Sequence, residues 1–215
     1  MRIAIVNTWR GGAVHNISYP IYEWLRDNDE ENKYEYITVR EIELDPKFDT
    51  SFDGFDLVHF TYFANIPRYL QEIEVPFTCM VHHFGAGKED VYSTQLHQWA
   101  PERIFVPETF IQRQLGARNV PKVVRIPYAF DQREYNPTPL PDEFVVGFLG
   151  CDSFAKRFDV IRKACKALDV PVLDFDRKTR NEEIDFLEKE TILDFYEDIA
   201  CYVCASWTDG GPPRS

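Results

Sequence analysis

The sequence contains no apolar run long enough to span a membrane. A spanning helix needs about 18–20 consecutive apolar residues, whereas the first apolar run extends only from Ile3 to Val6 and is followed by polar and turn residues. That run also lacks the length of a secretion signal. We therefore expect a cytoplasmic protein.

Basic residues are scarce as well. The chain has 24 lysines and arginines against 36 aspartates and glutamates, so its formal net charge is −12 at pH 7 and its pI is about 4.9. A surface of this sign repels phosphate backbones and anionic lipids. We expect no nucleic-acid partner and no strong membrane face, while a local basic site for one small anion stays open.

Cysteine is limited to five residues, an odd number. With no secretion signal, this count indicates free thiols. Cys201 and Cys204 form a CxxC pattern, which redox and zinc sites use. Residues three apart on a strand point to opposite faces, and there is no second CxxC. We predict instead that both cysteines are core side chains of a buried strand over 200–205.

The composition that remains suits a globular α/β protein. Of the 215 residues, 44% are hydrophobic, which suffices for one large domain or two small ones. Short apolar runs alternate with amphipathic stretches, and this order predicts parallel sheets with flanking helices. The predicted strands cover 3–7, 34–39, 56–60, 77–82, 104–106, 123–126, 144–149, 170–175 and 200–205. The predicted helices cover 16–25, 66–73, 108–115, 157–168 and 191–198.

A domain boundary is predicted at Asn136–Pro141. Prolines at 137, 139 and 141 cannot continue a helix or a central strand. The strand, glycine loop and helix order then restarts at Phe144. We predict two Rossmann-like domains, residues 1–135 and 136–215.

Gly11 and Gly12 stand between the first predicted strand and the first predicted helix. Glycines here let backbone N–H groups approach an anion at the helix N-terminus. They do not form the GxGxxG dinucleotide fingerprint, which is absent. A tight strand-to-helix turn is the alternative interpretation.

His82 and His83 follow the fourth predicted strand. Ligands of open parallel sheets bind outside the carboxyl ends of the strands, and an imidazole there can bind a sugar hydroxyl or move a proton. Neighbouring residues on a strand face opposite ways, so we expect only one ring to reach a cleft. The alternative is a pair of structural histidines. No third ligand nearby supports a metal site.

Lys156 and Arg157 open a predicted helix, where cations are electrostatically unfavourable. A bound phosphate would account for them, and a solvated basic pair is the alternative. Thr208–Pro213 follows a strand and offers Asp209, Gly210 and Gly211 as a sugar-hydroxyl site, with a simple turn as the alternative. The DxD pattern Asp174-Phe-Asp176 is interpreted as chance.

Taken together, these segments resemble the GT4-like retaining glycosyltransferases of the GT-B fold. Residues 3–12 look like that family's first strand and GG loop, and Asp56–Phe60 looks like its DvvH strand. The segment ending at His82-His83 is similar to the strand that carries the family's cleft histidine. Ile126–Asp131, with Tyr135–Pro137, resembles the end of the N-terminal domain.

The resemblance continues in the second half. Phe144–Arg157 looks like the strand, glycine loop and lysine that precede the first helix of the donor domain. Leu193–Gly211 is similar to the family segment that ends in E-G-G-P. The matching positions there are Tyr196, Ser206, Asp209, Gly210, Gly211 and Pro212.

The resemblance implies a GT-B fold with an acceptor-side domain over 1–135 and an incomplete donor domain over 136–215. It implies transfer of a sugar from a UDP- or GDP-linked donor to a hydroxyl of a glycan, lipid or small-molecule acceptor, with retention of configuration. Members of this fold generally use no bound metal, so no metal and no cofactor are expected. The implied catalytic residues are His82, His83 and Asp209. The implied donor-binding residues are Gly11, Gly12, Lys156, Arg157, Gly210 and Gly211.

The chain also departs from the family pattern. Lys156 matches the family's phosphate-binding lysine, but Cys151 stands where an arginine is usual, and Arg157 would have to compensate. Asp209 matches the first acid of an E-x7-E motif whose second acid would fall beyond Ser215. We expect either a fragment of a longer protein, the interpretation we favour, or a degenerate member.

Two other functions remain open. A non-catalytic binding or scaffold protein derived from the GT-B fold would account for the missing arginine and acid. Another Rossmann-type enzyme, such as a nicotinamide-dependent oxidoreductase, is disfavoured because the GxGxxG fingerprint is absent and no obvious ribose-binding acid stands at the end of the second predicted strand.

Overall fold

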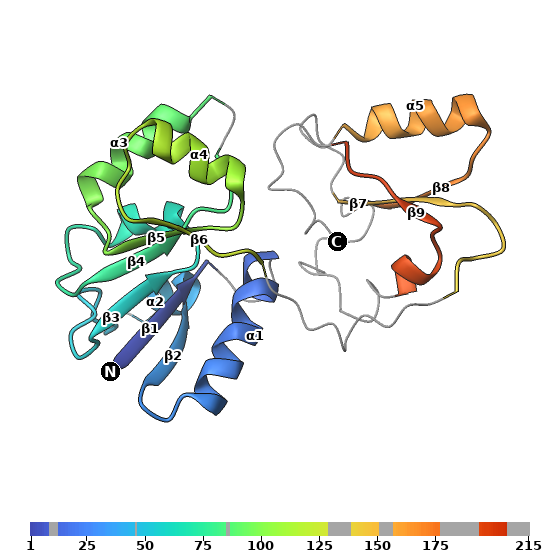
Figure 1. The fold of residues 1–215 in the computed structure, drawn as a ribbon. Coiled ribbons are helices and arrows are strands. Elements are labelled where there is room, and N and C mark those ends of the chain that lie inside the picture. The colour runs from blue at the N-terminus through green and yellow to red at the C-terminus, as the bar shows by residue number, and fades with distance from the viewer. Residues whose placement is uncertain are drawn as a thin grey trace. The chain divides into compact units, whose positions relative to one another are not determined.

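The computed structural model describes residues 1–8, 13–45, 47–84, 87–128, 139–150, 157–176 and 194–205. The chain divides into two compact units, Met1–Ala129 (unit 1) and Phe130–Ser215 (unit 2) (Figure 1). Each unit contains a parallel sheet with helices, so the predicted α/β class with parallel, Rossmann-like sheets is confirmed at that level. The sequence had placed the boundary between residues 135 and 136.

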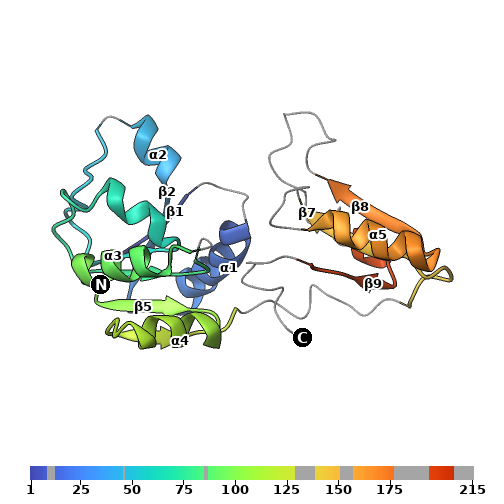
Figure 2. The same cartoon turned by 90° about the horizontal axis from the view of Figure 1, so that it is seen from above.

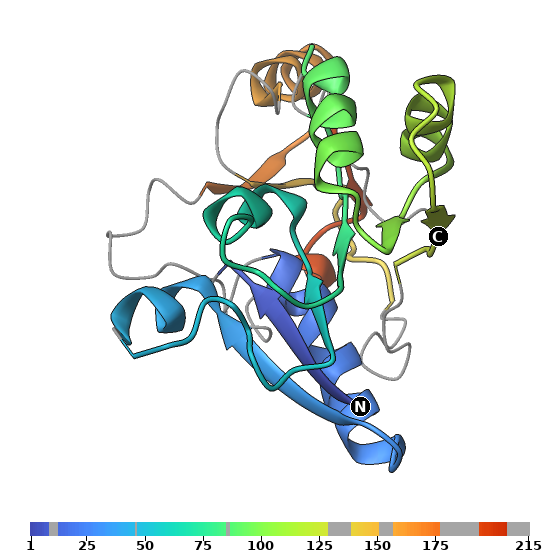
Figure 3. The ribbon, with the colours of Figure 1, turned by 90° about the vertical axis from the view of Figure 1, so that its left-hand side faces the viewer.

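Unit 1 is built on a six-stranded parallel sheet with the order β2-β1-β3-β4-β5-β6. Its strands are β1 (Arg2–Asn7), β2 (Lys33–Thr38), β3 (Leu57–Phe60), β4 (Phe77–Met80), β5 (Arg103–Val106) and β6 (Val123–Arg125). Its helices are α1 (Ala13–Asn28), α2 (Val39–Leu44), the 3-10 helix η1 (Phe63–Arg68), α3 (Glu89–Trp99) and α4 (Thr109–Ala117). The course of these elements can be followed in Figure 3.

One face of this sheet forms the main core of unit 1. Side chains alternate along each strand, and Val6, Val58, Phe60 and Cys79 on this face are fully buried. They belong to one apolar cluster with residues of α2, η1, α3 and α4. Of the five helices described in unit 1, four therefore cover the same face.

The other face is covered by α1. Four side chains at helical spacing, Val14, Ile17, Ile21 and Leu25, border a cavity between this helix and the sheet. None of residues 14–28 is buried. In Figure 1, α1 lies on the side of the sheet away from α3 and α4. The helix thus shields the sheet without packing closely on it.

The sequence did not predict helices α2 and α3, and it predicted one further helix at the wrong position. The short helix α2 depends on a capping box, in which Thr38 and Glu41 satisfy each other's backbone N–H groups. Helix α3 buries only Ser93 and Leu96, so its apolar period is weak. The helix predicted over 66–73 is instead η1, which begins and ends earlier and contains Pro67.

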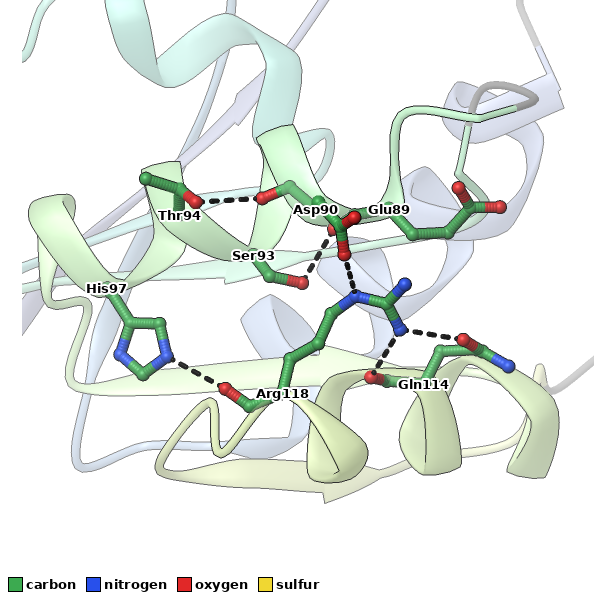
Figure 4. A network of polar contacts seen from close by, with 7 residues as sticks. All are labelled: Glu89, Asp90, Ser93, Thr94, His97, Gln114 and Arg118. Atoms are coloured by element: carbon green, nitrogen blue, oxygen red, sulfur yellow. Dashed lines mark hydrogen bonds and ion pairs between the residues drawn. The ribbon is translucent and has the colours of Figure 1, made fainter.

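Arg118, the residue that ends α4, ties this helix to α3 (Figure 4). Its Nε donates to Asp90 Oδ1 at 2.6 Å, and its Nη1 donates to the carbonyl oxygen and the side-chain oxygen of Gln114. His97 Nε2 donates to the Arg118 carbonyl oxygen at 3.1 Å. Because Asp90 is largely exposed, the ion pair itself contributes at most about 1 kcal/mol, and the network chiefly fixes how the two helices meet.

Unit 2 contains a smaller parallel sheet with the order β8-β7-β9. Its elements are β7 (Val146–Gly150), α5 (Phe158–Leu168), β8 (Val172–Asp176) and β9 (Cys201–Tyr202). Helix α5 lies along one face of the sheet (Figure 2) and stacks Phe158 on Phe148, with ring centroids 4.4 Å apart. On Gly147, a Cβ would collide with Ile199 and Phe195, so this strand position favours glycine.

The prediction that Cys201 and Cys204 are core residues of a strand over 200–205 is wrong. Strand β9 covers only Cys201–Tyr202, Cys201 is half-buried and Cys204 is exposed. Val203 and Ala205 supply the apolar contacts to the core instead, which leaves the residue between them pointing outward. The described cysteines are all free thiols. Over the described ranges, no helix combines the length and the apolarity needed to cross a membrane.

Candidate functional site

The candidate site lies at the carboxyl ends of the central strands of unit 1. The chain passes from β1 to β2 on one side and then returns past β1 to β3 on the other. Such a reversal between neighbouring parallel strands opens a crevice at their carboxyl ends, where ligands of doubly wound sheets bind. Asn7 ends β1, and Thr61 directly follows β3.

A buried polar cluster occupies this position. The Thr61 hydroxyl lies 2.8 Å from Asn7 Oδ1 and 3.1 Å from the Val6 carbonyl oxygen, both of which accept. Asn65 Nδ2 donates to Thr8 Oγ1 at 3.1 Å. Asn7, Thr61 and Asn65 are each at most 4% exposed. Buried polar groups persist where they are hydrogen-bonded, so this cluster fixes the ends of β1 and β3 against each other.

His82 extends the cluster to β4 and to the segment after β6. Its Nε2 lies 2.6 Å from the Thr61 carbonyl oxygen, and its Nδ1 lies 2.6 Å from the Tyr128 hydroxyl. A carbonyl can only accept, so Nε2 carries the proton. In a neutral ring Nδ1 then accepts from Tyr128. Burial lowers the pKa of His82, which keeps the ring neutral, and burial raises the pKa of Tyr128.

The two adjacent histidines have different surroundings. His82 is 6% exposed and uses both ring nitrogens within the protein. His83 is exposed, and its ring centroid lies 6.3 Å from that of Tyr62. Of the pair, only His83 presents its imidazole at the surface. His82 positions the strand ends that surround it.

The cavity between α1 and the sheet extends to this polar cluster. It has a volume of about 370 Å³, and Thr61, His82 and Tyr128 form its polar end. His59 lies farther along β3 with its Nδ1 2.8 Å from Thr78 Oγ1. Burial, together with the neighbouring His82, lowers the pKa of His59 to about 4. A neutral imidazole therefore lines a largely apolar part of the cavity.

Arg157 is the described part of the predicted phosphate site in unit 2. It precedes α5 with a left-handed backbone, φ 54°, which is uncommon outside glycine. Its Nε lies 3.7 Å from Asp159 Oδ1, in the first turn of α5. That carboxylate complements both the cation and the helix N-terminus, so Arg157 has a protein partner without a bound anion.

Several predicted site residues lie outside the described residues. They are Gly11, Gly12, Lys156, Asp209, Gly210 and Gly211. Of the DxD pattern, Asp174 accepts from Arg162 at 2.6 Å. Within the described residues, no three histidines, cysteines or acids gather as a metal site would require.

Sequence reasoning identified His82 but missed the residues that hold it. Thr61 and Tyr128 contact His82 across 21 and 46 positions of the chain, and neither carries a local pattern. His59 lies within the predicted strand Asp56–Phe60. The one signal that could have identified it as a site residue is its polar side chain in an apolar run.

Comparison with known proteins adds no family assignment. No protein-family model matches the chain, and no curated protein matches it.

Proposed function

We propose that the chain belongs to a GT-B-type retaining glycosyltransferase that moves a sugar from a UDP- or GDP-linked donor to an acceptor hydroxyl. The observation that carries this proposal is the polar cluster at the carboxyl ends of β1, β3 and β4, with exposed His83 beside buried, neutral His82. It coincides with the position where the sequence resembles the family's cleft histidine. The two parallel-sheet units are compatible with the fold.

In this proposal, His83 supplies an imidazole to the sugar, and His82 holds the adjoining backbone. The diphosphate leaving group develops negative charge, which cations and helix N-terminal amides stabilise. Lys156 and Arg157 precede α5 and supply those cations. Arg157 would exchange its ion pair with Asp159 for the phosphate.

The proposal is tested by titrating the chain with UDP and GDP in a calorimeter. We expect one nucleotide to bind at one site per chain, and we expect Lys156→Ala to weaken binding about 10-fold or more, as the loss of a charge-assisted hydrogen bond implies. Lys166→Ala is the matched control, because Lys166 is an exposed lysine in the last turn of the same helix. Binding of neither nucleotide overturns the donor site.

A non-catalytic descendant of the same fold is the second candidate. The ion pair between Arg157 and Asp159 favours it, since that cation is already satisfied. Cys151, where the family has an arginine, points the same way. Nucleotide binding without release of sugar from UDP- or GDP-linked donors would favour this candidate over the enzyme.

A further inference from the structure

The cavity between α1 and the sheet of unit 1 has the size of a ligand site. Its volume is about 370 Å³, and ligand pockets span about 300–1,000 Å³. Leu57, which begins β3, and Thr61, which directly follows β3, both border it. The cavity therefore runs along the strand for about 13 Å, given a rise of roughly 3.3 Å per residue.

Apolar side chains predominate in both walls of this cavity. Helix α1 contributes Ile17 and Ile21, and the sheet contributes Ile5, Met80 and Phe105. Protein interiors are normally packed to the density of organic crystals, yet no side chain of residues 14–28 is buried. An occupant of the cavity would supply the contacts that α1 lacks.

The polar groups in the walls restrict the chemistry of that occupant. Thr61 is paired with Asn7, and His82 uses both of its nitrogens. His59 uses Nδ1 with Thr78, and its Nε2 has no hydrogen-bond partner among the described residues. None of the described residues that line the cavity is a lysine, arginine, aspartate or glutamate. A charged ligand would therefore be buried without a counter-charge, which is costly.

We propose that this cavity binds a neutral, largely apolar small molecule that carries a hydroxyl group, with the hydroxyl on His59 Nε2. A hydroxyl both donates and accepts, so it satisfies Nε2 in either tautomer of the neutral ring. The site is made by unit 1 and does not depend on glycosyl transfer. If the donor-site proposal fails, the cavity proposal is unaffected. If the cavity proposal fails, the donor-site proposal is unaffected.

The test uses 1-naphthol and naphthalene, two neutral aromatic probes that differ by one hydroxyl, in equilibrium dialysis against the 215-residue chain. We expect both probes to bind with one site per chain, and 1-naphthol to bind about fivefold tighter, the factor that one net hydrogen bond supplies. Ile17→Trp fills the cavity from α1 and should weaken both probes at least 10-fold. Asn16→Trp places the same side chain on an exposed position of α1 and should leave both affinities within twofold.

His59→Phe separates the hydrogen bond from the apolar contact. It keeps a ring in the wall, so naphthalene should still bind, while the fivefold preference for 1-naphthol should disappear. Saturable binding that Ile17→Trp does not affect overturns the proposal. So does self-association of the chain, measured by sedimentation, that Ile17→Trp abolishes, because a second copy would then cover this face.

Discussion

His82 and His83 are adjacent in the chain and have opposite surroundings. The buried ring joins Thr61 to Tyr128, while the exposed ring can meet a ligand. Both residues follow the end of β4 at Met80, and the contacts of His82 with Thr61 and Tyr128 are what set its ring apart from the exposed ring of His83. One histidine therefore supports the local structure and its neighbour remains available for chemistry.

Replacing His82 should destabilise unit 1. His82→Leu preserves most of the side-chain volume but leaves the Thr61 carbonyl and the Tyr128 hydroxyl without their partner. We expect a loss of about 1–3 kcal/mol in the free energy of unfolding, measured with urea. His83→Leu is the control and should change stability by no more than about 0.5 kcal/mol. Equal losses in the two variants would contradict the assigned roles.

His59 should make stability depend on pH. Its pKa is about 4 in the folded protein and about 6.5 in an unfolded chain. Between these values the unfolded state binds more protons, so the folded state is fully favoured above pH 6.5 and loses stability as pH falls toward 4. The full contribution is about 3 kcal/mol, and the lowered pKa of His82 acts in the same direction.

Urea unfolding of the wild type and His59→Asn between pH 7 and 4.5 measures this effect. The variant cannot titrate, so its stability should fall less steeply over this range. His97→Asn replaces an exposed histidine of α3 and should follow the wild type. Parallel curves for the wild type and His59→Asn would refute the assignment.

At the scale of secondary-structure elements, one residue at the end of α3 and one residue inside α4 do not suit the backbone conformations that they adopt. Helix α3 stops at Ala100, which has a left-handed backbone with φ 47°. Glycine adopts that conformation without the steric cost that a Cβ adds. Helix α4 instead contains Gly116, which has room for a Cβ and a negative φ. Glycine would suit position 100 better, and alanine would suit position 116 better.

Opposite substitutions should therefore both stabilise unit 1. Ala100→Gly should raise the free energy of unfolding by about 1 kcal/mol because it removes strain. Gly116→Ala should raise it by about 0.5–1 kcal/mol because alanine has the higher helix propensity. Thermal unfolding of the single and double variants measures the gains, which should add. A lower Tm for Ala100→Gly would show that the left-handed cap is not strained.

The strands were easier to predict from the sequence than the helices. Runs such as Ile3–Asn7 and Phe144–Leu149 are apolar because parallel strands are covered on both faces, which gives a strong local pattern. Helix α3 buries few side chains, and α2 depends on one capping box, so neither shows a clear period. His82 was predicted from its place after a strand, but its partnership with Tyr128 depends on tertiary folding and leaves no trace in local sequence.

At the scale of the whole molecule, the described residues form two apolar cores, one in each unit. One contains Cys79 and the other Cys165, and each thiol is at most 6% exposed. Burial raises the pKa of Cys79 to about 12, which further suppresses its reactivity. The two thiols can therefore report on the opening of the two units separately.

Gly147→Ala should loosen unit 2 alone. The added Cβ would overlap Ile199 and Phe195, and overpacking of this kind costs about 1–3 kcal/mol. Alkylation by iodoacetamide, followed by mass spectrometry, should proceed roughly 5- to 100-fold faster at Cys165, with the rate at Cys79 unchanged. Ala100→Gly is the control in unit 1, and it should leave the alkylation rate at Cys165 unchanged. Equal acceleration at both cysteines would mean that the two cores open together.

The loose packing of α1 has a consequence for local unfolding. Its side chains between 14 and 28 are not buried, and Pro20 interrupts its hydrogen bonds. β1 and β3, by contrast, are each paired with strands on both sides. In native-state hydrogen exchange, the amides of α1 should exchange through small local openings, whereas those of β1 and β3 should exchange only through global unfolding. The helix beside the cavity can therefore open while the sheet that carries the candidate site stays folded.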